Sequence, residues 1–254
     1  MITLPPQTMR QNRITRQQHN RKTIQHDNRA TRNKMLKIQR FVCNMFQENC
    51  YIVSDDTNEC VIIDCGAFFD EEKNAIANYL KSNGLTPKHL LCTHGHIDHN
   101  FGNKFVFDTF GLHPEVHKGD QPLMNKLGAQ AKAFIGVDCG NDFPAVSKHL
   151  EDGGKVSFGN HTFTITGTPG HTPGSVFLYC KEERLAFSGD TLFQMSIGRT
   201  DLELGDFDEI MRSLEHIANA LPPDTTILPG HGGSTTMKEE LAHNPYLNVK
   251  GVQR

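Results

Sequence analysis

The sequence lacks any apolar run that approaches membrane-spanning length, which excludes a transmembrane helix. Its first 34 residues also lack the apolar core, of at least about seven residues, that a secretory signal carries. These absences lead us to expect a cytoplasmic protein that does not contact a membrane. With 254 residues and 37% hydrophobic content, the chain can bury a sizeable core.

The sequence has no C-x-x-C pair, although it contains seven cysteines. We interpret most of them as buried small hydrophobes in a reducing compartment, because they lie in or beside strand-like runs. Nothing local supports a nucleophilic cysteine. The six residues in such runs are Cys43, Cys50, Cys60, Cys65, Cys92 and Cys180.

Charge is unevenly distributed along the chain. Residues 1–34 hold eight of the 26 Lys and Arg and one of the 29 acids, a net of +7, which leaves the remainder at −10. An acidic body disfavours a nucleic-acid-binding surface. Because residues 1–34 have no apolar periodicity, we predict a disordered basic extension there and one folded domain over residues 35–254. A contact of the tail with a polyanion is the alternative.

Strand-like and helix-like patterns interleave along the body. Expected strands cover 37–43, 49–54, 60–64, 88–92, 115–117, 156–158, 162–166, 175–180, 184–187 and 225–228. Expected helices cover 70–83, 100–110, 121–134, 207–221 and 238–243, and 136–155 is expected to be a surface loop near the functional site. We therefore predict an α/β fold with two packed β-sheets and helices on their outer faces.

Four metal-competent side chains lie within six residues, inside the stretch Thr93–Asn100. His94, His96 and Asp98 are two residues apart, so an extended backbone directs them to one side. Asp98 and His99 are adjacent, so both can face a metal only if the chain turns there. The pattern suits two metals side by side, and a His-rich polar loop is the alternative.

One local pattern recurs in the later part of the chain. A hydrophobic strand ends, a Gly follows, and a metal-competent side chain comes next. Gly lets the backbone bend sharply there, and packed sheets can bring such strand ends to one edge. Each side chain taken alone is more typical of a loop, but together with the first motif they are candidate ligands. They are His171, Asp190 and His231.

The set T-H-x-H-x-D-H, a lone His, a Gly-Asp and a late Gly-His resembles the metal motifs of the metallo-β-lactamase fold, over about residues 39–244. The stretches G-R-T-D at 198–201 and P-G-H-G at 229–232 look most like its glyoxalase II-like branch, the hydroxyacylglutathione hydrolases. The resemblance implies an αβ/βα four-layer sandwich, in agreement with the strand pattern. It also implies that residues 35–254 are a catalytic domain.

The resemblance further implies two divalent metals joined by a bridging carboxylate, with Asp98 and Asp190 as the acidic members of the catalytic centre. Imidazole and carboxylate donors without thiolate suit Zn²⁺, and also Fe or Mn. Asp64 matches an Asp that supports a ligand from outside, or caps a turn. Arg199 either holds a substrate carboxylate or, as we favour, pins its own loop. The implied ligands are His94, His96 and His171 for one metal, Asp98, His99 and His231 for the other, and Asp190 for both.

The implied function is hydrolysis of a small-molecule thioester, of the S-lactoylglutathione kind, by a hydroxide that bridges the metals. Glutathione-specific glyoxalase II enzymes carry a helical C-terminal domain that holds the thiol. Only 23 residues follow His231, so we expect that domain to be absent and carry over no glutathione contacts.

Three alternatives remain. Persulfide dioxygenases of the same fold use one Fe and also show a G-R-T-D stretch. A non-catalytic metal-binding scaffold is a second alternative, although structural zinc sites are usually closed by four ligands and seven leave open positions. A β-lactamase fits less well, because no export signal is present.

We expect residues 1–34 to be dispensable, since they have no apolar face to bury. A chain that begins at Met35 should keep the melting temperature and the specific activity of the full chain. A large loss of either would show that the tail is part of the fold.

Overall fold

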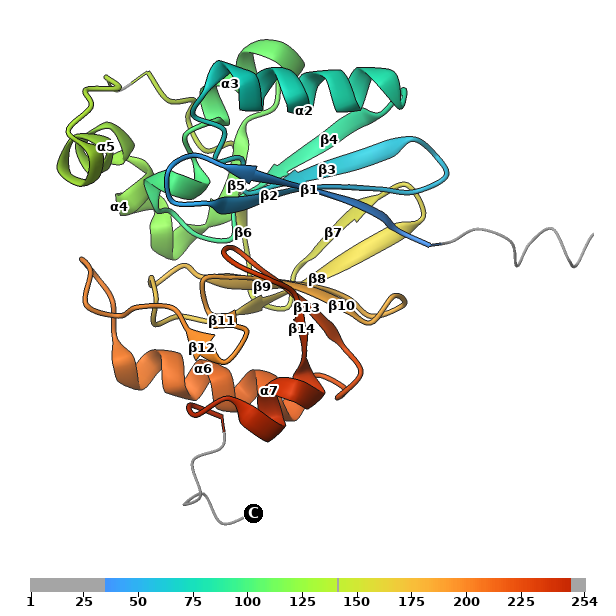
Figure 1. Cartoon of the computed structure of the whole chain (residues 1–254), viewed down its shortest axis with the longest axis vertical. Helices are drawn as coiled ribbons and strands as arrows, with labels where there is room; N and C mark the ends of the chain where they lie inside the picture. Colours follow the sequence, from blue (N-terminus) through green and yellow to red (C-terminus); the bar gives the residue numbers. More distant parts are fainter. Residues whose placement is uncertain (1–34, 141, 248–254) are drawn as a thin grey trace, which may run out of the picture. The chain divides into compact units, whose positions relative to one another are not determined.

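The structure is a computed structural model that describes residues 35–140 and 142–247. Two six-stranded β-sheets pack against each other, and helices cover the outer face of each sheet (Figure 1). This four-layer arrangement confirms the predicted fold. The expectation for residues 1–34 lies outside the described residues.

The first sheet follows the chain in simple order from β1 to β6. The first three strands pair antiparallel, and from β3 onward the neighbours run parallel. Helices α2 (Asp70–Ser82) and α3 (Asn103–Phe110) lie over its outer face (Figure 1). The strands are β1 (Lys37–Cys43), β2 (Glu48–Ser54), β3 (Glu59–Ile63), β4 (Thr86–Leu91), β5 (Pro114–His117) and β6 (Lys148–Leu150).

The second sheet has the order β14-β13-β10-β9-β8-β7, and helices α6 (Phe207–Ala220) and α7 (Met237–His243) cover its outer face (Figure 1). Strands β8, β10 and β13 run in one direction, because β9 is antiparallel to β8 and β10 while β13 is parallel to β10. Their carboxyl ends therefore meet at one edge. The strands are β7 (Lys155–Phe158), β8 (His161–Gly167), β9 (Val176–Cys180), β10 (Leu185–Gly189), β13 (Thr226–Pro229) and β14 (Thr235–Thr236).

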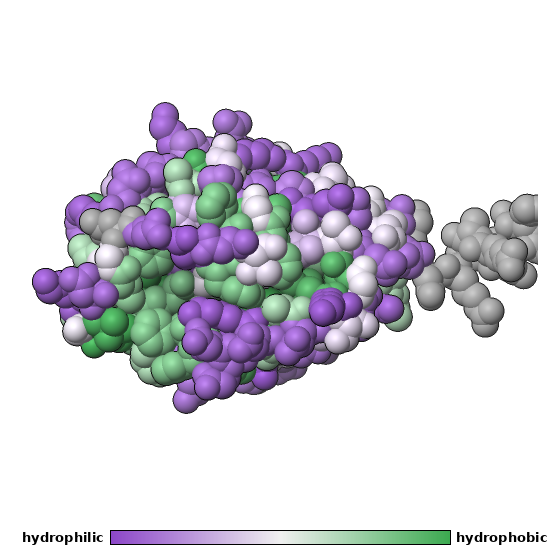
Figure 2. Space-filling view, turned by 90° about the horizontal axis from the view of Figure 1, so that it is seen from above, coloured by the Kyte–Doolittle hydropathy of each residue, from purple (hydrophilic) through white to green (hydrophobic). Residues whose placement is uncertain are grey.

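Apolar side chains fill three layers, one between the sheets and one under each set of helices. The layer between the sheets contains Ile63 from the first sheet and Phe163 and Phe187 from the second. Alternation along each strand sends neighbouring side chains to opposite faces, so one strand supplies two layers. Outside these layers polar residues prevail, with hydrophobic patches between them (Figure 2). Among residues 35–140 and 142–247, no helix has the length and apolarity needed to cross a bilayer.

Several elements differ from the sequence-based expectation. The end of the His motif forms a separate 3-10 turn (Ile97–His99), and α3 starts only at Asn103. The expected helix 121–134 is divided into α4 (Gln121–Met124) and α5 (Leu127–Ile135). The hairpin strands β11 (Leu192–Phe193) and β12 (Ser196–Ile197), like β14, have two residues each, too few to show a period.

Candidate metal centre

The ligand residues predicted from sequence come together where strands end. His94 follows β4, His171 follows the end of β8, Asp190 follows β10, and His231 follows β13. The candidate ligands form groups whose donor atoms lie within 4.8 Å of one another. The expected convergence of the four strand ends is therefore present in the fold.

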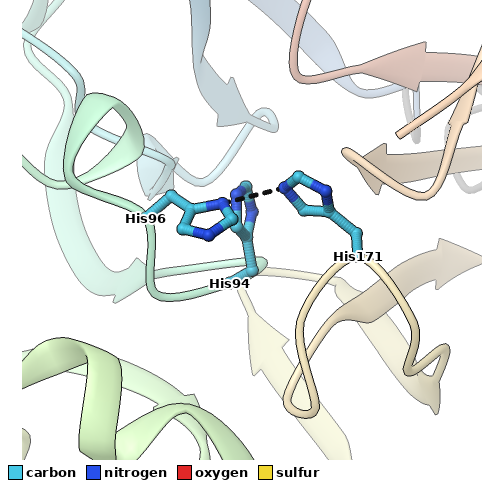
Figure 3. A group of neighbouring side chains, drawn as sticks. All are labelled: His94, His96 and His171. Carbon is cyan, nitrogen blue, oxygen red and sulfur yellow. Dashed lines mark hydrogen bonds between the residues drawn. The ribbon is translucent and has the colours of Figure 1, made fainter. Parts of the chain in front are cut away.

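The first group contains His94, His96 and His171, all of them buried. Figure 3 shows the three rings facing one another, with His94 and His96 on one loop and His171 on a separate one. Nδ1 of His96 lies 2.9 Å from Nε2 of His171. Two nitrogens on one tetrahedral zinc ion lie about 3.3 Å apart, given bonds of about 2.0–2.1 Å. The spacing thus approaches that of two ligands of one ion.

The second group contains Asp98, His99 and His231. Nε2 of His231 lies 3.2 Å from Nε2 of His99 and 3.2 Å from Oδ2 of Asp98. Asp98 and His99 lie in the 3-10 turn, and the donor atoms of both reach the same group although the two residues are adjacent in sequence. The turn that the sequence required at this position is present.

Asp190 lies between the two groups. Its Oδ1 is 3.3 Å from Nε2 of His99, and its Oδ2 is 3.5 Å from Nε2 of His231 and 3.7 Å from Nε2 of His171. One carboxylate therefore reaches histidines of both groups.

The buried donor atoms fit a divalent metal. Nε2 of His94 is buried and has no hydrogen-bond partner among the described residues. Buried polar atoms nearly always find a partner, so an imidazole nitrogen directed into the cluster without one suits a metal ligand. The donor set of imidazole and carboxylate groups matches Zn²⁺, Fe or Mn better than Ca²⁺.

Burial and charge keep His94, His96 and Asp190 in ligating form. Burial lowers the pKa of His94 well below its ordinary value, and lowers that of His96 to about 3, so both rings are neutral. Burial opposes ionisation of Asp190, but the neighbouring histidines, His99 foremost, together outweigh it and hold the pKa of Asp190 well below its usual range. Burial likewise lowers the pKa of His99, and Asp190 and Asp98 more than reverse this. The centre thus combines buried negative charge with free nitrogen lone pairs.

Groups outside the cluster fix the orientation of three ligand rings. Nδ1 of His171 lies 2.7 Å from the Arg199 carbonyl oxygen, and Nδ1 of His231 lies 3.1 Å from that of Phe46. Nδ1 of His99 lies 3.1 Å from Oδ2 of Asp64. Each contact directs the opposite nitrogen inward, as partners of metal-bound histidines generally do.

Asp64 also accepts hydrogen bonds from the backbone N–H and the hydroxyl of Thr93, at 2.7 and 2.6 Å. It adopts a left-handed backbone conformation with φ of 49°, which is unusual for a residue other than Gly. Its contact with His99 matches the supporting role implied by the resemblance. Its bonds to Thr93 anchor the start of the His motif.

The side chain of Arg199 forms a paired contact with Asp201, with Nε–Oδ1 and Nη2–Oδ2 both 2.8 Å. This geometry agrees with our favoured interpretation that Arg199 pins its own loop. Its carbonyl oxygen, which the sequence could not single out, is the atom that contacts the ligand ring of His171.

Sequence reasoning missed several buried polar residues that hold the ligand loops. Asp120 accepts hydrogen bonds from the N–H of Gly95 at 2.6 Å, from the Thr172 hydroxyl at 2.7 Å and from the N–H of Gly174 at 2.6 Å. It therefore joins the loop of the first two histidines to the loop of the third. No local pattern marks Asp120, because its partners lie 25 to 54 positions away.

Asn100 and Gln130 support the same loop. The Asn100 amide donates to the carbonyl oxygens of His94 and His96, at 3.1 and 2.6 Å. Gln130 contacts the Gly95 carbonyl and the Ile97 N–H, both at 3.1 Å. These bonds satisfy backbone polar groups of a buried loop.

Glu48 is a further buried acid that the sequence did not single out. Its Oε1 lies 4.0 Å from Nδ1 of His99, and neither carboxylate oxygen has a hydrogen-bond partner among the described residues. Burial raises its pKa well above the ordinary value.

A cavity of about 400 Å³ opens over the cluster. Five candidate ligands line it, namely His96, Asp98, His171, Asp190 and His231. Segment 136–155, which was expected near the site, contributes no described residue to the lining of this cavity. Its β6 strand extends the first sheet instead. The other lining residues are Phe46, Ile97, Phe134, Phe193, Ser196, Ile197, Arg199 and Leu202.

Comparison with known proteins identifies the family. The model of the Metallo-beta-lactamase superfamily matches residues 43–231, so the chain belongs to this superfamily. Hydroxyacylglutathione hydrolase GloC of Haemophilus influenzae is 33% identical over 218 residues, which cover 85% of this chain and all of GloC. The family resemblance read from the motifs is confirmed, and the family indicates a metal-dependent hydrolase.

Solved structures give the same fold. The BLEG-1 B3 metallo-beta-lactamase superposes with a TM-score of 0.75 at 36% identity, over 84% of this chain and 99% of that one. TTHA1623 in a di-iron-bound form superposes with a TM-score of 0.72 at 33% identity, over 82% of this chain and all of that one.

The position of Asp190 predicts that Asp190→Asn loses metal. The change would keep the shape but remove the negative charge that a binuclear centre needs between two dications, which repel each other at about 3.5–4 Å. We expect about one metal per chain to be lost together with most of the activity, measured by elemental analysis and turnover. Asp208→Asn, at an exposed position of α6, is the matched control. Normal content of both metals with normal turnover would remove Asp190 from the bridging role.

The contacts of Asp120 predict that Asp120→Asn loosens the centre. Both carboxylate oxygens of Asp120 accept hydrogen bonds, but the amide of Asn replaces one oxygen with an NH₂ donor. That donor would face an N–H or hydroxyl group, and the lost hydrogen bond should lower the free energy of unfolding by about 1–3 kcal/mol. We expect lower stability to urea and faster loss of metal to a chelator. Thr172→Val, which removes one of the three bonds, should have a smaller effect in the same direction. Unchanged chelation rates in Asp120→Asn would contradict the role.

Proposed function

We propose that this chain is a binuclear metal-dependent hydrolase that cleaves a thioester, an S-acyl-thiol such as S-lactoylglutathione. The observation that carries the proposal is the position of Asp190, whose carboxylate reaches histidines of both ligand groups within 3.7 Å. A bridge between two ions requires this arrangement. The relative GloC, named a hydroxyacylglutathione hydrolase, supports the thioester as substrate.

In this proposal the first group of three histidines holds one metal, and Asp98, His99 and His231 hold the other. Bound divalent metals lower the pKa of water toward neutrality and polarise a carbonyl oxygen. The chain keeps His94 and His96 neutral by burial, and its outer carbonyl and carboxylate contacts aim the ligand rings inward. The ionised Asp98 and Asp190 offset the charge of two cations.

Zinc is the metal we propose, with Fe or Mn as alternatives suited to the same donors. The di-iron-bound form of the similar TTHA1623 supports iron among these. All seven cysteines are free thiols, which supports a reducing, cytoplasmic setting.

Metal content and substrate turnover together separate this proposal from its alternatives. About two metals per chain in protein purified without added metal, with hydrolysis of S-lactoylglutathione, supports the binuclear hydrolase. One Fe per chain and O₂ consumption with a persulfide would support the dioxygenase. Hydrolysis of a β-lactam instead of a thioester would favour the activity named for BLEG-1. Bound metal with none of these activities would support a scaffold.

We expect modest selectivity for the thiol half of the substrate. Arg199 is the only Lys or Arg among the described residues that line the cavity, and Asp201 already pairs with it. A tripeptide thiol with two carboxylates finds no second cation there. Lactoyl thioesters of glutathione and of a smaller thiol should therefore differ in kcat/KM by less than about tenfold, or roughly 1.4 kcal/mol. A thousandfold preference for glutathione would contradict this, because about 4 kcal/mol needs dedicated contacts.

A further inference from the structure

The cavity over the metal centre has an apolar wall built from separate parts of the chain. Phe46 comes from the β1–β2 hairpin, Phe134 from the end of α5, and Phe193 from β11. Ile197 from β12 and Leu202 from the segment that follows it also belong to this apolar wall. Phe46 is 40% exposed and Phe134 47% exposed, although both are large and apolar. Exposed apolar side chains that gather around a cavity indicate a binding surface.

Charge complementarity points to an uncharged ligand group. The metal ligands form one part of the cavity lining, and the rest of the lining has Ser196 and the Asp201-paired Arg199 as its polar members. A charged group held against this wall would lose its hydration without gaining a partner, which is costly. An aliphatic or aromatic group gains free energy in the same place.

The size of the cavity exceeds what a lactoyl group needs. At about 400 Å³ it falls in the range of roughly 300–1,000 Å³ of pockets that enclose drug-sized ligands. A three-carbon hydroxyacyl group would leave most of the apolar wall in water. Biological thiols are polar and charged, so the part of a thioester that matches this wall is its acyl group.

We propose that the wall formed by Phe46, Phe134 and Phe193 is an acyl-binding subsite, and that the preferred substrates are thioesters of medium-chain or aromatic acyl groups. This inference rests on the proposed thioester hydrolysis. In that reaction the acyl C–S bond breaks and a C–O bond to water forms. One proton of the water passes to the thiolate, and the products are a carboxylic acid and a thiol.

A matched pair of substrates tests the preference. Lactoyl and hexanoyl thioesters of one small thiol, N-acetylcysteamine, differ only in the acyl group. We expect kcat/KM of the metal-loaded enzyme to be at least tenfold higher for the hexanoyl compound. Equal values, or a preference for lactoyl, would overturn the inference.

Variants of the wall locate the preference. Phe134→Ala and Phe193→Ala should each lower the hexanoyl-to-lactoyl ratio at least threefold, and Phe134→Leu should restore most of it. Phe69→Ala is the matched control, because Phe69 is 45% exposed and is not among the residues that line the cavity. Melting temperature and metal content of each variant separate a loss of binding from a loss of folding. A ratio that none of the wall variants changes would overturn the subsite.

A binding measurement separates this inference from the proposed function. A ketone in which CH₂ replaces the thioester sulfur is not hydrolysed, so calorimetry reports its affinity without turnover. We expect the hexanoyl ketone to bind at least tenfold tighter than the lactoyl ketone, and Phe134→Ala to weaken the hexanoyl ketone alone. If the hexanoyl ketone binds more tightly as expected but no thioester is hydrolysed, the proposed hydrolase activity would be overturned and the acyl-binding subsite would be supported. Turnover without a difference in ketone affinity would overturn the subsite alone.

Discussion

Buried negative charge among imidazole rings is the constraint on which the centre depends. Asp190 is buried and Asp98 half-buried, and neighbouring histidines lower the pKa of both acids, although an isolated buried carboxylate is strongly unfavourable. Positive charge must lie beside them. The rings of His99 and His231 partly supply it, since the acids raise the pKa of both rings against the effect of burial. His94 and His96 stay neutral, so the compensation is incomplete on their side. Divalent cations complete it and use the free lone pairs at the same time.

Such a centre needs a rigid surround, because the donors would otherwise turn toward water. The fold supplies it with contacts from one loop to another. Asp120 joins the loops of the two halves, and the carbonyl oxygens of Phe46 and Arg199 hold the rings of His231 and His171. Bonds of this kind orient a ligand and raise its basicity at once. The metal centre is therefore as dependent on backbone placement as on the ligand side chains.

The sequence predicted the parts of this site that have a local signal. The H-x-H-x-D-H spacing and the Gly that precedes Asp190 and His231 are visible within a few residues, and the strand periods gave the two packed sheets. Asp120, Gln130 and the carbonyl of Arg199 act through partners far along the chain, so no local pattern marks them. The segment 136–155 was assigned near the site from its Gly and Asp content. Its pairing through β6 with β5 ties it to the first sheet instead.

The metal ligands and the apolar wall of the cavity also differ in how firmly the fold holds them. The ligands sit at strand ends, where both sheets and the three apolar layers fix the backbone. The apolar wall of the cavity sits on a hairpin tip, a helix end and the segment around β11 and β12, which few strand bonds restrain. Side chains at such positions can change with little cost to the sheets, since connecting segments tolerate variation. The ligand positions are thus built into the strand ends, whereas apolar residues of the cavity such as Phe134 could change without disturbing a ligand.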